Sequence, residues 1–133
     1  MRSKLQQDRI TAFVTIGSEE LEAAPQIHRN LPRQGLYFLQ QATEKHLRAV
    51  LEAAGIAAGP THDLVALAVR LPKDDPMRSI FNQFDDLSNA ATRLRYPGST
   101  GRLTVVKAEH VAARLKDVER LVTTVQTFLA DDR

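Results

Sequence analysis

Residues 36–51 read LYFLQQATEKHLRAVL and contain neither proline nor glycine. Apolar positions in this stretch recur at steps of three and four residues, which places them on one face of an α-helix. Pro32 suits the first position of such a helix and Gly55 suits its C-terminal cap, so we expect a helix over about residues 32–54. Its expected inner face consists of Leu36, Leu39, Ala42, His46, Val50 and Ala53.

Most of the remaining chain has the same helical spacing. Further helices are expected over about residues 3–29, 61–71, 76–94 and 104–130, the third of these beginning with Asp75 as cap and Pro76 in its first turn. The sequence therefore predicts an all-α fold, an antiparallel up-and-down bundle of four long helices and one short helix. It forms a single domain over residues 1–133, in which residues 1–10 are open to interpretation as an N-terminal extension. The predicted core contains Leu39, Ala42, Val50, Leu64, Leu67, Phe84, Leu87, Leu115, Val118 and Val122.

Two residues interrupt the expected first helix. Gly17 costs about 1 kcal/mol relative to alanine in a helix interior, and Pro25 removes one backbone hydrogen bond. Two alternatives stay open from the sequence. Either one helix kinks at Pro25, or two shorter helices meet near Gly17 with Ser18 as the N-cap of the second.

Composition excludes several classes of protein. The chain has 133 residues, of which 43% are hydrophobic and 26% are charged, as is typical of one folded domain. The sequence has no cysteine, so a disulfide scaffold, a cysteine-ligated metal and thiol catalysis are excluded. No apolar run approaches the ~20 residues of a membrane helix. The first residues lack the apolar segment of a secretory signal, so we expect a cytoplasmic location.

Four short motifs occur together in one order along the chain. Residues 36–51 resemble the central helix of HEPN domains, whose pattern is close to F-h-x-Q-Q-A-x-E-K-x-L-K-A-x-L. Residues 61–64 (THDL) and 95–97 (RYP) match a turn and a motif of that family, and residues 13–14 (FV) with 20–24 (ELEAA) resemble its W-L…D-L-x-x-A pattern. The chain therefore resembles a HEPN domain over about residues 11–130. Gly17, Pro25 and His46 depart from the usual residues at their positions.

The resemblance implies a bundle of four main helices plus a short one, usually assembled as a two-fold dimer. Such domains are often encoded beside, or fused to, a minimal nucleotidyltransferase, which implies a partner of that kind. Some members are metal-independent ribonucleases and act as toxins. Those members carry an arginine, four to six intervening residues and a histidine on the dimer seam.

That ribonuclease motif is absent from this chain. His110 comes closest to it, because seven residues separate His110 from Arg102. Cleavage of RNA by acid–base chemistry needs an imidazole and a cation within reach of one phosphate. Two interpretations stay open: Arg102 and His110 form a degenerate catalytic pair, or both are ordinary exposed residues. The absence of the motif favours a protein that is not an enzyme, without deciding the matter.

The candidates for ligand binding are Glu44, Lys45, Arg48, His62, Arg95 and Tyr96. The first three follow the polar flank of the helix over residues 32–54. They form either a solvated face or one side of a groove shared with Arg95 and Tyr96, where cations would meet phosphate and the ring would stack on a base. His62 either ties its loop to a neighbouring helix or contacts a ligand.

The region of residues 87–108 carries Arg93, Arg95, Arg102 and Lys107 and has no acidic residue. This patch would suit phosphates or an acidic partner, or would simply aid solubility. The last helix, which follows this region in the sequence, has a heptad-like seam and a second apolar flank. An apolar flank that is exposed to water usually marks a contact surface. We therefore expect a two-fold homodimer. The resemblance to HEPN domains implies that its seam brings the two basic regions together in one cleft. The flank consists of Val105, Val106, Ala108, Ala112, Leu121 and Phe128.

No phosphate-binding loop, hydrolase elbow or metal-ligand spacing occurs in the sequence, so no cofactor and no metal are expected. The expected function is that of a dimeric binding module, which partners a nucleotidyltransferase in a toxin–antitoxin-type pair, or binds a nucleotide or RNA. The alternatives are a ribonuclease toxin with a degenerate Arg/His pair and a non-catalytic structural dimer.

Overall fold

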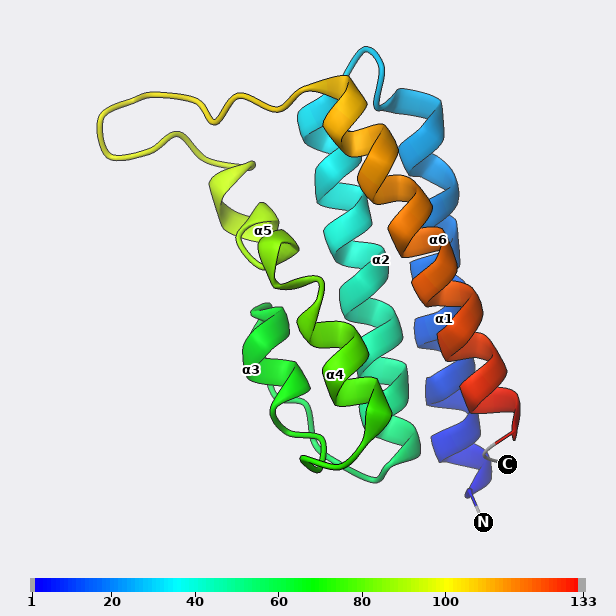
Figure 1. The fold of residues 1–133 in the computed structure, drawn as a ribbon. Coiled ribbons are helices and arrows are strands. Elements are labelled where there is room, and N and C mark those ends of the chain that lie inside the picture. Colours follow the sequence, from blue (N-terminus) through cyan, green and yellow to red (C-terminus); the bar gives the residue numbers. More distant parts are fainter. Residues whose placement is uncertain (1, 132–133) are drawn as a thin grey trace.

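The computed structural model describes residues 2–131, and these residues form helices joined by turns and loops, with no β-strand among them (Figure 1). The all-α prediction is therefore confirmed; residues 1 and 132–133 of the predicted domain lie outside the described residues. The long helices are α1 (Lys4–Ile27), α2 (Pro32–Ala53) and α6 (Ala108–Asp131). The shorter elements are α3 (Leu64–Ala68), α4 (Pro76–Asn82), the 3₁₀ turn η1 (Asp85–Leu87) and α5 (Ala90–Arg93).

Helix α1 is continuous, so the alternative of two helices meeting near Gly17 is wrong. Its first turn is closed by a capping box, in which Ser3 Oγ accepts from the Gln6 amide at 3.0 Å and Gln6 Oε1 accepts from the Ser3 amide at 3.3 Å. Pro25 lies inside the helix, close to its C-terminal end. Gly17 is buried against α2, where a Cβ atom would lie 2.7 Å from His46 Nδ1. The glycine therefore allows the two backbones to approach closely.

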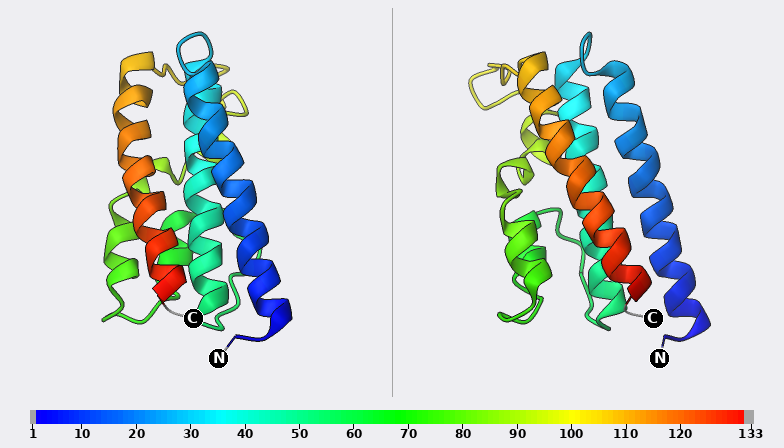
Figure 2. Two further views of the ribbon diagram at one scale, coloured as in Figure 1. Left: turned by 90° about the vertical axis from the view of Figure 1, so that its right-hand side faces the viewer. Right: turned by 45° about the vertical axis from the view of Figure 1, so that its right-hand side comes forward.

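Helix α2 is the central element of the fold. Helices α1 and α6 pack along it, and α3, η1 and α5 contact another part of its surface (Figures 1 and 2). Every residue of the predicted core belongs to a single apolar cluster, in which Leu115 is partly buried and the others are buried. On α6, the predicted flank is not left in water as a whole, because Leu121 is only 3% exposed within the single chain. The flank is exposed in part, as expected, because Val105 is 84% exposed.

The predicted helix over residues 76–94 is divided into α4, η1 and α5, so its expected continuity is wrong. The reason is a buried period of three: Phe81, Phe84, Leu87 and Ala90 are all buried. A 3₁₀ turn stacks residues three apart on one side, whereas an α-helix would rotate them progressively away from the core. The amides of Gln83 and Phe84 accordingly bond three residues back, to Ile80 and Phe81. The predicted cap is confirmed, because Asp75 Oδ1 accepts from the Met77 amide at 2.9 Å.

Residues 94–107 join α5 to α6 and are called the arm from here on. The arm leaves the helical body as a long excursion before it returns to the start of α6 (Figure 1). Its tip is a tight turn in which Gly101 has a φ of +78°, a left-handed conformation that favours glycine. The arm carries three exposed large apolar side chains, Tyr96, Leu103 and Val105.

Candidate functional site

Glu44 is the centre of a buried polar cluster on α2. The helical spacing of Gln40, Glu44 and Arg48 places them on one stripe, and the carboxylate accepts from Gln40 Nε2 and from Arg48 Nε, each at 3.0 Å. His62, in the loop before α3, completes the cluster, with its Nδ1 at 3.1 Å from Glu44 Oε2. Burial alone would raise the pKa of Glu44, but the hydrogen bonds from Gln40, His62 and Arg48 outweigh it and lower that pKa.

Arg48 uses its remaining donors to hold the loop between α2 and α3. Its guanidinium donates to the carbonyl oxygens of Gly59 and Thr61, the first at 2.9 Å. Gln40 Nε2 adds a longer contact of 3.4 Å to the carbonyl oxygen of His62. The structure thus brings three predicted site residues together, and their polar atoms are engaged with one another and with the loop backbone.

Lys45 is the neighbour of Glu44 in sequence, but it is joined to this cluster indirectly, through Gln41, whose amide donates to Gln40 Oε1 at 2.6 Å. Its ammonium donates to Glu20 on α1 at 2.9 Å and to Gln41 at 3.0 Å, and both ends of the Glu20 pair are largely buried. Burial raises the pKa of Glu20, and it does so against the lowering effect of Lys45. Lys45 therefore links α1 to α2.

Arg95 and Tyr96 lie at a third place, at the base of the arm. The Arg95 guanidinium lies 5.4 Å from the ring centre of Tyr37 on α2 and 5.8 Å from that of Tyr96. This cation–π arrangement joins the arm to α2. Within residues 2–131, no hydrogen bond, ion pair or cation–π contact connects Arg95 or Tyr96 to the Glu44 cluster. The six candidate residues thus form three groups: Glu44 with Arg48 and His62, Lys45 with Glu20 of α1, and Arg95 with Tyr96.

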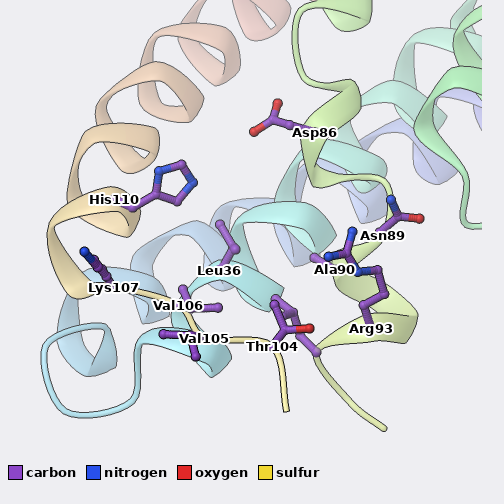
Figure 3. A pocket seen from close by; sticks show the side chains of 11 residues that line it. Leu36, Asp86, Asn89, Ala90, Arg93, Thr104, Val105, Val106, Lys107 and His110 are labelled. Atoms are coloured by element: carbon purple, nitrogen blue, oxygen red, sulfur yellow. The ribbon is translucent and has the colours of Figure 1, made fainter. Parts of the chain in front are cut away.

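A pocket of about 510 Å³ lies where α5, the arm and the first turn of α6 meet. Figure 3 shows His110 and Asp86 extending toward the same space from α6 and η1, with Leu36 of α2 at the back. The apolar lining comes from Leu36, Ala90, Leu94, Val105 and Val106, and the polar lining from Asp86, Asn89, Arg93, Thr104, Lys107 and His110. An apolar interior with a few polar groups at its edge is typical of a small-molecule site.

Basic side chains predominate among the ionisable residues around this pocket. Arg93, Lys107 and His110 line it, and it lies at the N-terminal end of α6, where the helix dipole is positive. Asp86 is the one acidic residue among the lining residues, and its carboxylate accepts from both Nε and Nη2 of Arg114. The hydrogen bond to Asp86 is the main cause that raises the pKa of Arg114. Because Arg114 balances Asp86, an anion would meet a net positive field.

Sequence reasoning paired His110 with Arg102, whereas the pocket brings His110 together with a different arginine. Arg93 lines the pocket with His110, whereas Arg102 is not among the lining residues and lies near the tip of the arm. Asp86, Asn89 and Lys107 were not proposed as site residues. The run of four cations over residues 87–108 was the available signal for Arg93 and Lys107.

Two further properties of the described chain bear on the site. Of the helices within residues 2–131, none combines the length and hydropathy needed to cross a bilayer. The same part of the chain holds no group of three or more His, Asp or Glu side chains arranged to bind a metal ion.

Comparison with known proteins identifies the family. The model of the HEPN domain family matches residues 12–130, which is nearly the whole chain. No curated protein and no solved structure gives a significant match. The matched region includes α2, the loop before α3 and the pocket-lining residues of η1, α5 and α6. The chain therefore belongs to the HEPN domain family.

Proposed function

We propose that this protein is a nucleotide-binding HEPN module that does not cleave RNA itself. The observation that carries the proposal is the pocket of about 510 Å³ with an apolar interior and three basic side chains in its lining. Ligand pockets are typically about 300–1,000 Å³, so a mononucleotide is of suitable size. The base would lie against Leu36 and Val106, and the phosphates would lie among Arg93, Lys107 and His110.

The proposed ligand follows from the chemistry of these groups. Arg and Lys form charge-assisted hydrogen bonds with phosphate oxygens, and the start of α6 adds a favourable dipole. Asn89, also in the lining, offers both a donor and an acceptor for the edge of a base. A purely apolar ligand would leave the basic side chains without a partner.

The assembly proposed with this function is that of its family. We propose an antiparallel up-and-down bundle that forms a two-fold homodimer and acts with a minimal nucleotidyltransferase in the cytoplasm, as a toxin–antitoxin-type pair. HEPN domains often dimerise, and membership of the family supports this part of the proposal. Light scattering over a range of concentrations tests the dimer, and a concentration-independent monomer would remove it.

Calorimetric titration with ATP, GTP, CTP and UTP tests the pocket. Arg93→Gln and His110→Gln are expected to weaken binding of the preferred nucleotide by about tenfold or more, because each removes a group placed at the phosphates. Arg120→Gln is the matched control, since the Arg120 side chain is 72% exposed and does not line the pocket. Affinity that is the same in all four proteins, or absent in the wild type, would overturn the proposal.

A second candidate function is metal-independent RNA cleavage. One observation favours it: Arg93 and His110 line the same pocket, although their sequence separation is outside the family's ribonuclease spacing. His110 would move the proton and Arg93 would hold the charged phosphate. Incubation of RNA with the protein in EDTA separates the two functions. Cleavage that is lost in His110→Ala favours the ribonuclease, and intact RNA together with nucleotide binding favours the binding module.

A further inference from the structure

Residues 103–107 of the arm show a period of two in their exposure to solvent. Leu103 is 60% exposed and Val105 is 84% exposed, whereas Thr104 and Val106, which alternate with them, are half-buried. Val106 packs against the core cluster, and Arg33 Nη2 of α2 donates to the Thr104 carbonyl oxygen at 3.1 Å. One face of this segment therefore lies on the helical body, and the other presents two branched apolar side chains to solvent.

The backbone hydrogen bonding of the segment also differs between alternate residues. In a chain with a period of two, the N–H and C=O groups of alternate residues point to opposite edges. The carbonyl oxygens of Arg102 and Thr104 are used, by the Gly98 amide at 3.2 Å and by Arg33. The amide and carbonyl groups of Leu103 and Val105 have no hydrogen bond within residues 2–131. The edge that carries Leu103 and Val105 is thus open to another strand.

The charges around the segment indicate what kind of strand would fit. Arg93, Arg95, Arg102 and Lys107 lie within or next to the arm, and residues 87–108 have no acidic residue. A second copy of the arm, paired antiparallel with the first, would bring the cations of two arms together with no acidic residue on either arm, and like charges on paired strands are destabilising. A strand with acidic residues on either side of its apolar positions would instead be complementary.

The same observations favour a protein over a nucleic acid at this edge. Single-stranded RNA binds by stacking bases on aromatic rings, and the exposed face here carries leucine and valine. The neighbouring rings of Tyr37 and Tyr96 each have the Arg95 guanidinium over one face, which leaves only the other face for a base. A row of free amides and carbonyls with alternating apolar side chains is instead the arrangement that accepts a peptide by strand addition.

We propose that the Leu103–Val105 edge of the arm is a docking site for an extended acidic segment of a partner protein, bound by strand addition. The segment's backbone pairs with Leu103 and Val105, its apolar side chains cover theirs, and its carboxylates face Arg102 and Lys107. The docked segment also borders the nucleotide pocket, because Thr104, Val105 and Val106 line it. The proposal does not depend on nucleotide binding.

The test is an NMR titration of the ¹⁵N-labelled full chain with a synthetic peptide, acetyl-EEVTVTEE-amide, to millimolar concentration. We expect chemical-shift changes concentrated in residues 102–107 and slower exchange of the Leu103 and Val105 amides with solvent. A lysine-flanked peptide, acetyl-KKVTVTKK-amide, should bind at least tenfold more weakly. Equal binding of the two peptides, changes centred elsewhere, or no change with the acidic peptide would overturn the proposal.

Variants at positions outside the pocket make the test specific. Leu103→Pro removes an amide of the open edge and should weaken the acidic peptide at least tenfold. Arg102→Glu should reverse the preference toward the lysine-flanked peptide. Leu5→Ser is the matched control, because Leu5 on α1 is also an exposed leucine, and it should bind as the wild type does.

Two further results separate the alternatives. Arg93→Gln should weaken peptide binding far less than Arg102→Glu does, because the carboxylates of the bound segment face Arg102 and Lys107; loss of nucleotide binding alone would therefore not affect this proposal. An oligouridylate that shifts the same residues, competes with the acidic peptide and binds more tightly would assign the edge to RNA and overturn the proposal.

Discussion

Glu44 and His62 are 18 residues apart in sequence, yet His62 Nδ1 donates to Glu44 Oε2 at 3.1 Å. The carboxylate is buried in α2, whereas the His62 side chain is 65% exposed at the surface of the loop. Since Arg48 joins the same carboxylate and also binds the loop backbone, the loop before α3 is held to α2 by one buried acid. The cluster thus links the carbonyl oxygens of Gly59, Thr61 and His62 to side chains of α2.

Glu44→Gln should therefore weaken the fold at neutral pH. The change keeps the shape but removes the charge on which Arg48 and His62 converge, so we expect a loss of about 1.5–3 kcal/mol in the free energy of unfolding. Urea denaturation at pH 7 measures it. Glu22→Gln, at an exposed position on α1, is the control and should change stability by less than about 0.5 kcal/mol.

The acid dependence of stability tests the same carboxylate. The folded-state pKa of Glu44 is below its ordinary value of 4.5, so its stabilising effect is fully present above pH 4.5 and is lost as pH falls through the folded pKa. The wild type should lose stability in that window more steeply than Glu44→Gln. If the free energy of unfolding fell with decreasing pH in the same way for both proteins, the pKa of Glu44 would not be lowered in the folded state.

His46 should produce a separate pH dependence at higher pH. The ring is fully buried, Nδ1 donates to the Ala42 carbonyl oxygen at 2.8 Å, and burial lowers its pKa below the ordinary 6.5. The unfolded chain therefore binds a proton first, and stability falls as pH drops from about 6.5, by up to about 1.4 kcal/mol per pH unit. His46→Gln should remove this slope, and His110→Gln, at an exposed ring, should retain it.

Gly17→Ala tests the close approach of α1 and α2. A Cβ atom at Gly17 would lie 2.7 Å from His46 Nδ1 and 3.0 Å from Lys45 Cβ. Overpacking of this kind costs about 1–3 kcal/mol and exceeds the gain in helix propensity of about 1 kcal/mol, so a net loss of up to about 2 kcal/mol is expected. In a His46→Ala background the same substitution should become neutral or stabilising. If Gly17→Ala alone caused no loss in the free energy of unfolding, α1 and α2 would lie further apart than the structure shows.

The helices with a regular apolar period were predictable from sequence, and the others were not. Pro32 and Gly55 marked the ends of α2 correctly, because both residues act through their own backbone geometry. The division into α4, η1 and α5 was missed because apolar residues at both three- and four-residue steps are available there, and only packing against α2 and α3 selects Phe81, Phe84 and Leu87. The spacing of apolar residues along the chain therefore does not decide between one continuous helix and this division.

The candidate site shows the same limit. Glu44 and Arg48 were placed on one polar flank from their spacing on one helix, and a link from the His62 loop to a neighbouring helix was one of two interpretations. Arg93 and His110 come from different elements, and they meet only because the arm returns the chain to the start of α6 beside α5. A motif that counts residues between an arginine and a histidine does not detect a pair formed in this way.

Arg114 should control both the stability of the fold and the shape of the pocket. From α6 it donates to Asp86 and the Gln83 carbonyl oxygen near η1, binds Asp117 on its own helix at 3.0 Å, and lies 4.7 Å from the ring centre of Phe84. It therefore fixes η1, which carries Asp86 into the pocket, against α6. Arg114→Met keeps much of the aliphatic stem and removes these links, and it should cost about 1–3 kcal/mol on urea denaturation.

The same variant should also weaken nucleotide binding, because Asp86 would lose its counter-charge and its negative field would then reach the phosphates. Arg120→Met is the matched control: Arg120 binds the same Asp117 but is 72% exposed, so it should change stability by less than about 0.5 kcal/mol and leave binding intact. If the two variants behaved alike, the link from α6 to η1 would contribute nothing. If Arg114→Met lost stability while nucleotide affinity stayed the same, the pocket wall would be held by the apolar packing of Phe84 and Leu87 alone.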